Sequence, residues 1–124
     1  MANRFCHIEL GTKNIAKAKK FYKGLFKWKL SEFAGGYTLI DTGDQKSGGG
    51  MMQNQNSRQP SAWMPYVEVD DVKKAIAKAK NLGARIGLEY MEIPEGMGSF
   101  GTFTDPTGAA IGVWAAAKSK KGKK

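Results

Sequence analysis

The sequence predicts an α+β fold of two βαβββ modules whose curved sheets surround a central cavity. The main observation is an internal repeat: a pattern that starts at His7 returns 57 residues later, at Met64. In both copies, an alternating strand pattern leads into a helix with one apolar stripe, and three further strand-like runs follow. Glycine-rich and Asp-Pro turns separate these runs, which supports the same chain plan.

The first module is expected to span residues 3–54. Its opening strand alternates around His7, and Asn14 stands where the side-chain oxygen of an N-cap belongs. A helix with an apolar stripe follows, formed by Ile15, Ala18, Tyr22 and Leu25. The next strands are expected at 27–33, 37–42 and 49–54.

The second module is expected over residues 62–117, after a polar linker at 55–61. Asp71 takes the N-cap position, and Gly83 is typical of a helix C-cap. Strands are expected at 84–93, 99–105 and 109–115. The two modules would form a single domain over residues 1–117, with 118–124 as a disordered, lysine-rich tail.

The net charge of +9 first suggests a nucleic-acid partner. Five of the lysines lie in the tail, at Lys118, Lys120, Lys121, Lys123 and Lys124, which leaves +4 for the rest. We therefore expect no nucleic-acid partner, and keep binding of a polyanion by the tail as an alternative.

The remaining composition narrows the class of protein. No apolar run approaches the ~18–20 residues that a membrane helix needs, and no signal-peptide pattern is visible at the start. The single cysteine, Cys6, excludes an internal disulfide and suits a reducing compartment. These features predict a cytoplasmic protein with no membrane partner.

His7 and Glu9 are the candidate catalytic residues. His7 is the only histidine, and its imidazole can act as an acid or a base near neutral pH. Glu9 lies two residues later on the same strand, so the two side chains share a face. An apolar pocket would raise the pKa of a carboxyl at this position and make it a better base.

Three segments carry a family resemblance that covers about residues 4–116. They are HIELGTKNIAKAKKFYKGLFKW, YVEVDDVKKAIAKAKNLGA and FTDPTGAAIGVW, of which the last is the most specific. The chain resembles the vicinal oxygen chelate superfamily, which includes glyoxalase I, extradiol dioxygenases and bleomycin-resistance proteins. The resemblance implies small-molecule binding or catalysis and a homodimer.

Metal-dependent members of that superfamily carry one ligand on the first strand and one on the last strand of each module. The resemblance maps these positions to His7, a residue near Gly50, Met64 and Gly112. Glycine has no side-chain donor, and a thioether is a poor ligand for Zn, Mn, Ni or Mg. We therefore expect no metal cofactor, with His7 as a ligand only if a divalent metal does bind.

The family register also predicts a ligand pocket with apolar and aromatic walls. The expected lining residues are Met51, Met64, Tyr66, Phe100, Thr102 and Trp114.

Three functions remain open. The first is metal-independent binding or conversion of a small apolar or planar molecule, and the second is a divalent-metal lyase, isomerase or dioxygenase of glyoxalase type. For the second function, Glu9, Glu68 or Glu92 would be further candidate ligands. The third is interaction with a polyanion through the tail.

Overall fold

The computed structural model describes residues 2–45 and 48–118. They form two compact units. The N-terminal unit is Cys6–Pro65, and the C-terminal unit comprises the described residues of 1–5 and 66–124. The predicted lysine-rich tail at 118–124 lies, except for Lys118, outside the described residues.

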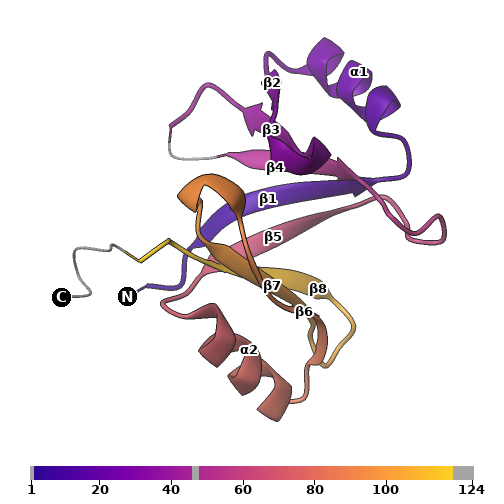
Figure 1. Ribbon diagram of the computed structural model, residues 1–124. Helices are drawn as coiled ribbons and strands as arrows, with labels where there is room; N and C mark the ends of the chain where they lie inside the picture. The colour runs from indigo at the N-terminus through magenta and orange to yellow at the C-terminus, as the bar shows by residue number, and fades with distance from the viewer. Residues whose placement is uncertain (1, 46–47, 119–124) are drawn as a thin grey trace. The chain divides into compact units, whose positions relative to one another are not determined.

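The N-terminal unit has the predicted βαβββ order (Figure 1). Its elements are β1 (Phe5–Thr12), α1 (Ile15–Leu25), β2 (Lys29–Glu32), the 3₁₀ turn η1 (Ala34–Gly36), β3 (Thr38–Asp41) and β4 (Gly49–Gln53). The sheet runs in the order β2-β3-β4-β1, with β1 parallel to β4 and the other pairs antiparallel.

The second half of the chain repeats this order, and its last three strands are longer than those of the first half. Its elements are β5 (Ala62–Glu68, of which 62–65 belong to the N-terminal unit and 66–68 to the C-terminal unit), α2 (Val72–Asn81), β6 (Arg85–Glu92), the 3₁₀ turn η2 (Pro94–Gly96), β7 (Ser99–Thr104) and β8 (Ala110–Ala115). β5 pairs with β8 in parallel. β8 pairs antiparallel with β7, and β7 pairs antiparallel with β6. The α+β expectation and the duplicated chain plan are therefore confirmed.

Both helices begin where the sequence predicts. The Asn14 side chain accepts a hydrogen bond from the Lys17 backbone N–H at 3.0 Å, and Asp71 accepts one from Lys74 at 3.1 Å. These bonds satisfy backbone donors that the first turn of a helix leaves without a partner. Gly83 follows α2 with a φ of 105°, a conformation that favours glycine.

Each helix covers one face of the sheet in its own unit. In the N-terminal unit the buried core is Leu10, Ile40 and Met51, against which Ile15, Ala18 and Tyr22 of α1 pack. Leu25 was predicted in the same stripe, but it is 57% exposed because it lies in the last turn of the helix. In the C-terminal unit, Val72 and Ile76 of α2 pack with Val113 and Ala115 of β8. Among the described residues, no helix is long and apolar enough to cross a membrane.

Candidate functional site

A hydrogen-bonded chain of three side chains lies on β1 and at the start of β3. The Tyr37 hydroxyl lies 2.8 Å from His7 Nε2 and donates a hydrogen bond to Glu9 Oε1 at 3.0 Å. His7 and Glu9 alternate with Leu10, which packs in the core beneath α1. The chain therefore occupies the sheet face that α1 leaves uncovered, where all three side chains are half-buried.

The direction of these bonds fixes the histidine tautomer. A phenol has a single proton, and Tyr37 gives it to Glu9. The bond between His7 and Tyr37 must then run from Nε2–H to the phenol oxygen. Burial lowers the pKa of His7 below its ordinary value, because desolvation disfavours the charged imidazolium. His7 is therefore a neutral Nε2–H donor at pH 7.

Gly50 makes room for the tyrosine. Glu9 pairs with Gly50 across β1 and β4, and Leu39 pairs with Gly50 from the other side. A Cβ added to Gly50 would collide with the Tyr37 hydroxyl and ring. The position where the family resemblance placed a metal ligand is thus filled by the Tyr37 phenol.

The C-terminal unit has the equivalent arrangement at Gly112. Tyr66 pairs with Gly112 in β5 and β8, and the 57-residue offset relates Tyr66 to Glu9. A Cβ on Gly112 would collide with the Tyr66 ring, which is only 4% exposed. Both glycines that replace expected metal ligands therefore lie under a tyrosine ring.

The predicted pocket residues do not all lie on one face. Met51 was expected to line the pocket, but it is fully buried in the core beneath α1. The reason is strand alternation: Met51 directly follows Gly50, so its side chain must point to the opposite face from the Gly50 position.

Four other pocket candidates do share a face of the C-terminal sheet. Thr102 pairs with Gly112, and Phe100 pairs with Trp114. The Tyr66 and Phe100 rings meet edge to face at 6.1 Å. The Thr102 hydroxyl accepts a hydrogen bond from the Leu88 backbone at 3.1 Å. Met64, on β5, is half-buried.

The Trp114 indole holds the turn before β7 in place. Its Nε1–H donates to the Met97 carbonyl at 2.9 Å, while the Met97 side chain remains 48% exposed. A Cβ on Gly98 would collide with the Trp114 indole and the Ala115 carbonyl. This close approach needs a glycine, so the turn is fixed against β8.

The described residues do not fit a divalent metal site of the glyoxalase type. They contain no group of three His, Cys, Asp or Glu side chains close enough to hold an ion. Of the alternative ligands, Glu9 is bonded to Tyr37, Glu68 to Arg4, and Glu92 to Tyr90 at 3.2 Å. Three protein ligands are the usual minimum for catalytic zinc.

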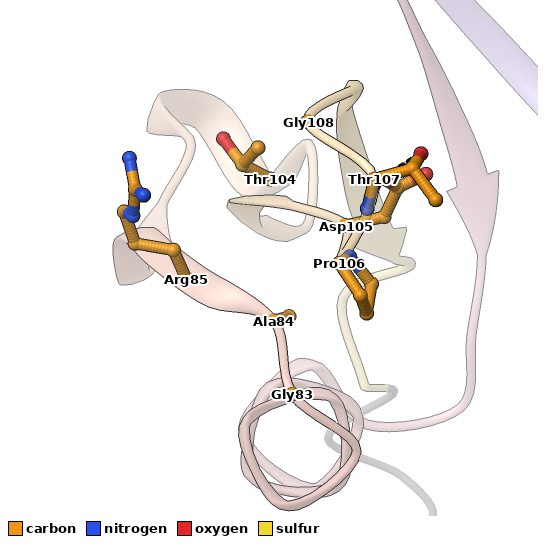
Figure 2. A pocket seen from close by; sticks show the side chains of 8 residues that line it. All are labelled: Gly83, Ala84, Arg85, Thr104, Asp105, Pro106, Thr107 and Gly108. Atoms are coloured by element: carbon orange, nitrogen blue, oxygen red, sulfur yellow. Dashed lines mark hydrogen bonds between the residues drawn. The ribbon is translucent and has the colours of Figure 1, made fainter.

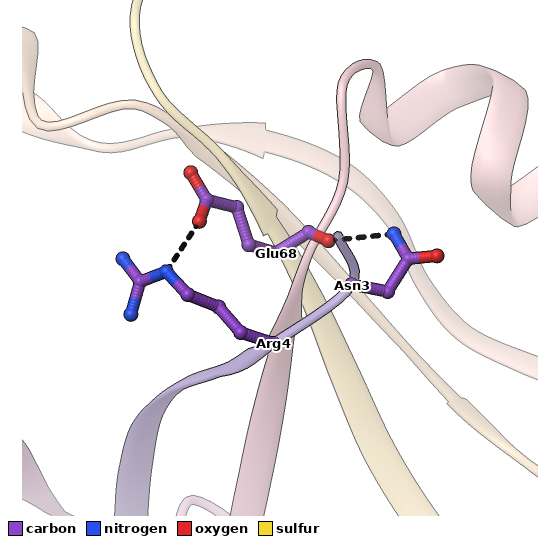
Figure 3. A network of polar contacts seen from close by, with 3 residues as sticks. All are labelled: Asn3, Arg4 and Glu68. Carbon is purple, nitrogen blue, oxygen red and sulfur yellow. Dashed lines mark hydrogen bonds and ion pairs between the residues drawn. The ribbon is translucent and has the colours of Figure 1, made fainter. Parts of the chain in front are cut away.

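Glu68 instead ties the N-terminal segment to β5. Figure 3 shows Arg4 Nε donating to Glu68 Oε1 at 2.8 Å and the Asn3 amide donating to the Glu68 carbonyl at 2.9 Å. The Arg4 side chain is 58% exposed, so the ion pair adds ~0–1 kcal/mol of stability. The ion pair holds the segment around Arg4 beside β5, and the Glu68 carboxylate is bonded to Arg4.

A surface hollow of about 700 Å³ lies beside the turn between β7 and β8. Figure 2 shows its lining: Gly83, Ala84, Arg85, Thr104, Asp105, Pro106, Thr107 and Gly108. The Asp105 carboxylate accepts hydrogen bonds from the Thr107 hydroxyl and backbone and from the Ala109 N–H. The Thr107 hydroxyl is the main cause of the lowered pKa of Asp105. The hydrogen bonds of this carboxylate therefore stabilise the turn between β7 and β8.

Sequence reasoning placed His7 and Glu9 on one face but missed Tyr37. Two signals could have found it. The mapped ligand position is a glycine, which leaves a space on the sheet. Antiparallel pairing of the neighbouring strand then brings the side chain of Tyr37, two residues before Leu39, to the same face.

Comparison with known sequences gives a consistent family. A sequence model described as the Glyoxalase/Bleomycin resistance protein/Dioxygenase superfamily matches residues 4–113. The anthracycline biosynthesis protein DnrV of Streptomyces peucetius is 29% identical over 126 residues, which cover 86% of this chain and 45% of DnrV. The provisionally named glyoxylase CFP32 of Mycobacterium tuberculosis is 31% identical over 116 residues, covering 88% of this chain and 44% of CFP32. The chain thus spans less than half the length of these relatives.

Solved structures share the fold at low sequence identity. Methylmalonyl-CoA epimerase from Mycobacterium tuberculosis superposes with a TM-score of 0.68 and 12% identity, over 97% of this chain and 91% of the epimerase. Homoprotocatechuate 2,3-dioxygenase from B. fuscum superposes with a TM-score of 0.67 and 18% identity, over 94% of this chain and 33% of the dioxygenase.

Proposed function

The chain belongs to the glyoxalase/bleomycin resistance protein/dioxygenase superfamily, and we propose that it binds a small apolar or planar molecule without a divalent metal. In this proposal the hydrogen-bonded chain of Glu9, Tyr37 and His7 makes the polar contact with the ligand. The same three groups can move a proton, so they would also serve a metal-independent reaction.

The observation that carries the proposal is the position of Tyr37 over Gly50. A family member that uses a metal needs a donor side chain there, and this chain has a glycine covered by a phenol. The phenol is bonded on one side to the mapped first-strand ligand, His7, and on the other to Glu9. The groups that remain can hydrogen-bond an organic molecule but offer too few donors for a catalytic ion.

Aromatic side chains support a planar or apolar ligand. Within the C-terminal unit taken by itself, Tyr66, Phe100 and Trp114 share one face of the sheet, and aromatic rings favour stacking or edge contacts with flat molecules. The name of the relative DnrV connects that protein with anthracycline biosynthesis. We extend a ligand of that class to the present chain as part of the proposal.

Calorimetry tests the proposal directly. EDTA-treated protein would be titrated first with Zn, Mn, Ni and Co, and then, free of metal, with 1,2-dihydroxyanthraquinone as a planar probe. We expect binding of the probe and only weak association of the metals. Stoichiometric metal binding that His7→Ala abolishes would instead support the metal-dependent lyase, isomerase or dioxygenase. Failure of the probe to bind would overturn the proposal for planar ligands.

We also propose that the chain forms a homodimer. Exposed apolar side chains lie on and beside α1: Phe21 at 59%, Leu25 at 57%, Phe26 at 43% and Trp63 at 40%. The rings of Phe26, Trp28 and Trp63 pack with Tyr22 as one cluster of the N-terminal unit. Such a patch is typical of an interface.

Light scattering with size-exclusion chromatography would test the dimer. The expected mass is twice the 13.5 kDa of one chain, and Phe21→Glu should shift it toward one chain. The control is Leu82→Glu, because Leu82 is 70% exposed at the end of α2 and is not part of this cluster. A wild-type mass of 13.5 kDa at micromolar concentration would refute the dimer.

A further inference from the structure

We propose that Tyr37 is a proton-transfer residue that selects ligands with an acidic enol or phenol hydroxyl and binds them as anions. This inference rests on the proposed function and deepens it, because it names the ligand chemistry. Tyr37 would accept the ligand proton while passing its own proton to Glu9, and His7 would stabilise the charge that develops.

The hydrogen-bond directions support this role. Tyr37 donates to Glu9 at 3.0 Å and accepts from His7 Nε2–H at 2.8 Å. A phenol oxygen has two lone pairs, so accepting a bond from His7 and another from a ligand hydroxyl is within its capacity. The proton path from ligand to carboxylate is then continuous through a single oxygen atom.

The transfer balances without a co-reactant. The ligand O–H bond breaks and a new O–H bond forms on Tyr37, while the original Tyr37 O–H bond breaks and a proton is bound by Glu9. The net change moves one proton from the ligand to Glu9 and one negative charge from Glu9 to the ligand oxygen. Tyr37 then donates its new proton to the ligand anion and accepts a hydrogen bond from protonated Glu9, while the His7 N–H remains a donor.

Half-burial penalises the localised negative charge of Glu9, because desolvation disfavours concentrated charge. The three side chains lie on the sheet face opposite α1, where water competes less for their hydrogen bonds, and moving the charge to a ligand that delocalises it lowers this penalty. His7 keeps its Nε2–H whether or not it takes up a second proton, so it donates throughout. A ligand with an acidic hydroxyl beside a carbonyl would shift its proton readily, because the resulting charge is delocalised.

Among the described residues of the C-terminal unit, the position that corresponds to Glu9 has no carboxylate. The residue that corresponds to Glu9 is Tyr66, which pairs with Gly112 and is only 4% exposed. Phe100 packs edge to face against it. At this repeat position, the carboxylate-phenol pair that the transfer requires therefore lies in the N-terminal unit.

Visible spectroscopy of bound 1,2-dihydroxyanthraquinone tests the inference, because neutral and ionised forms of this probe differ in colour. The measurement is made one pH unit below the titration midpoint of the free probe, where about ten molecules are neutral for each anion. The wild-type protein should bind mainly the anion and release no net proton to the buffer. Calorimetry in two buffers of different ionisation enthalpy measures that release.

Tyr37→Phe should still bind the probe but in its neutral form, with the apparent midpoint raised by about one unit or more. Glu9→Gln should give the same result and serves if Tyr37→Phe does not fold. Tyr90→Phe is the matched control, because it removes another tyrosine-carboxylate bond, to Glu92 on the edge strand β6. It should leave the bound spectrum unchanged.

The outcomes separate the two proposals. If wild type and Tyr37→Phe both bind the neutral probe, proton transfer is refuted and the proposed function stands. An anion that persists in Tyr37→Phe and Glu9→Gln also refutes it. If wild type does not bind the probe, the proposed function fails for this ligand class, and the inference fails with it.

Discussion

The two units share one backbone plan but fill the same position in different ways. Gly50 pairs with Glu9 in the N-terminal unit. In the C-terminal unit, Gly112 pairs with Tyr66, which lies 57 residues after Glu9 in the sequence. Tyr37 covers Gly50 from the start of β3, whereas Tyr66 covers Gly112 from β5 itself. One tyrosine is half-buried within a chain of polar groups, and the other is buried against an aromatic ring.

The difference indicates that the space above a glycine in a sheet can be filled either by a hydrogen-bonded polar side chain or by a packed aromatic ring. In the N-terminal unit, the carboxylate of Glu9 remains on the face and the phenol of Tyr37 bonds to it. In the C-terminal unit the corresponding residue is itself the ring that fills the space. We therefore expect substitutions in the N-terminal unit to affect ligand chemistry and those in the C-terminal unit to affect stability.

The largest effect on the free energy of unfolding is expected when a methyl group fills the space above Gly112 or Gly50. Gly112→Ala should lower the free energy of unfolding by about 3 kcal/mol, because the buried Tyr66 ring must move against Phe100. Gly50→Ala should cost about 1 kcal/mol, since the half-buried Tyr37 can swing away. Urea denaturation measures both values.

Gly24→Ala provides the control for these two substitutions. Gly24 lies within α1, and a Cβ there would meet nothing within 4 Å. Replacing a helical glycine with alanine should stabilise the protein by roughly 0.5–1 kcal/mol. Equal losses in Gly50→Ala and Gly112→Ala would show that the two tyrosines are equally fixed, which contradicts the proposed difference.

A second expected effect concerns the helix-covered faces. The Thr38 side chain is fully buried, and its hydroxyl is the buried side-chain group without a hydrogen-bond partner among the described residues. Thr38 pairs with Met51, whereas Gly101 pairs with Val113 at the matching place in the other unit. Thr38→Val should therefore stabilise the protein by about 1 kcal/mol, because an unpaired hydroxyl is replaced by a methyl group.

Thr38→Ser is the matched control, since it keeps the hydroxyl and removes the methyl group. Thermal unfolding should rank the melting temperatures as valine above threonine above serine. If Thr38→Val melts below wild type, the hydroxyl has a stabilising partner, such as a bound water.

The sequence allowed most of the fold to be predicted because the repeat supplies two copies of each signal. The caps Asn14 and Asp71 stand at matching positions, and strand register confirms the equivalence of Gly50 and Gly112. Residues related by alternation along one strand, such as His7 and Glu9, could also be placed on a common face.

The site was predicted less well because its third member comes from another strand. Tyr37 meets His7 and Glu9 only through the pairing of β3 with β4 and of β4 with β1, and neither register follows from local pattern. The same uncertainty put Met51 on the wrong face, since an error of one residue reverses the direction of every side chain.

The helix caps give a smaller, pH-dependent difference between the units. Asn14→Ala should cost about 1 kcal/mol at any pH, because its amide does not titrate. The hydrogen bond from the Lys74 backbone is the main cause of the lowered pKa of Asp71. The stability contributed by the ionised Asp71 cap is present above the pKa of 3.8 in the unfolded chain. It is lost as the pH falls through the lower pKa of the folded protein.

Asp71→Asn tests this difference, because asparagine caps a helix without titrating. Urea denaturation at pH 5 and pH 3 should show a smaller acid-induced loss in Asp71→Asn than in wild type. If Asp71→Asn loses as much stability as wild type between pH 5 and pH 3, other carboxyl groups cause the acid-induced loss.

The smallest effect on stability is expected from His7, whose place in the second repeat of the sequence is taken by Met64. Burial lowers the pKa of folded His7, so the unfolded chain binds more protons in the window between the unfolded value of 6.5 and the lower folded value. Stability from the neutral imidazole is therefore complete above about pH 6.5 and is lost as the pH falls through the folded pKa. His7→Gln can keep an N–H donor to Tyr37 without titrating and should flatten the stability profile between pH 7 and pH 5. If the variant retains the wild-type slope, groups other than His7 cause the pH dependence, and a buried neutral imidazole is no longer supported.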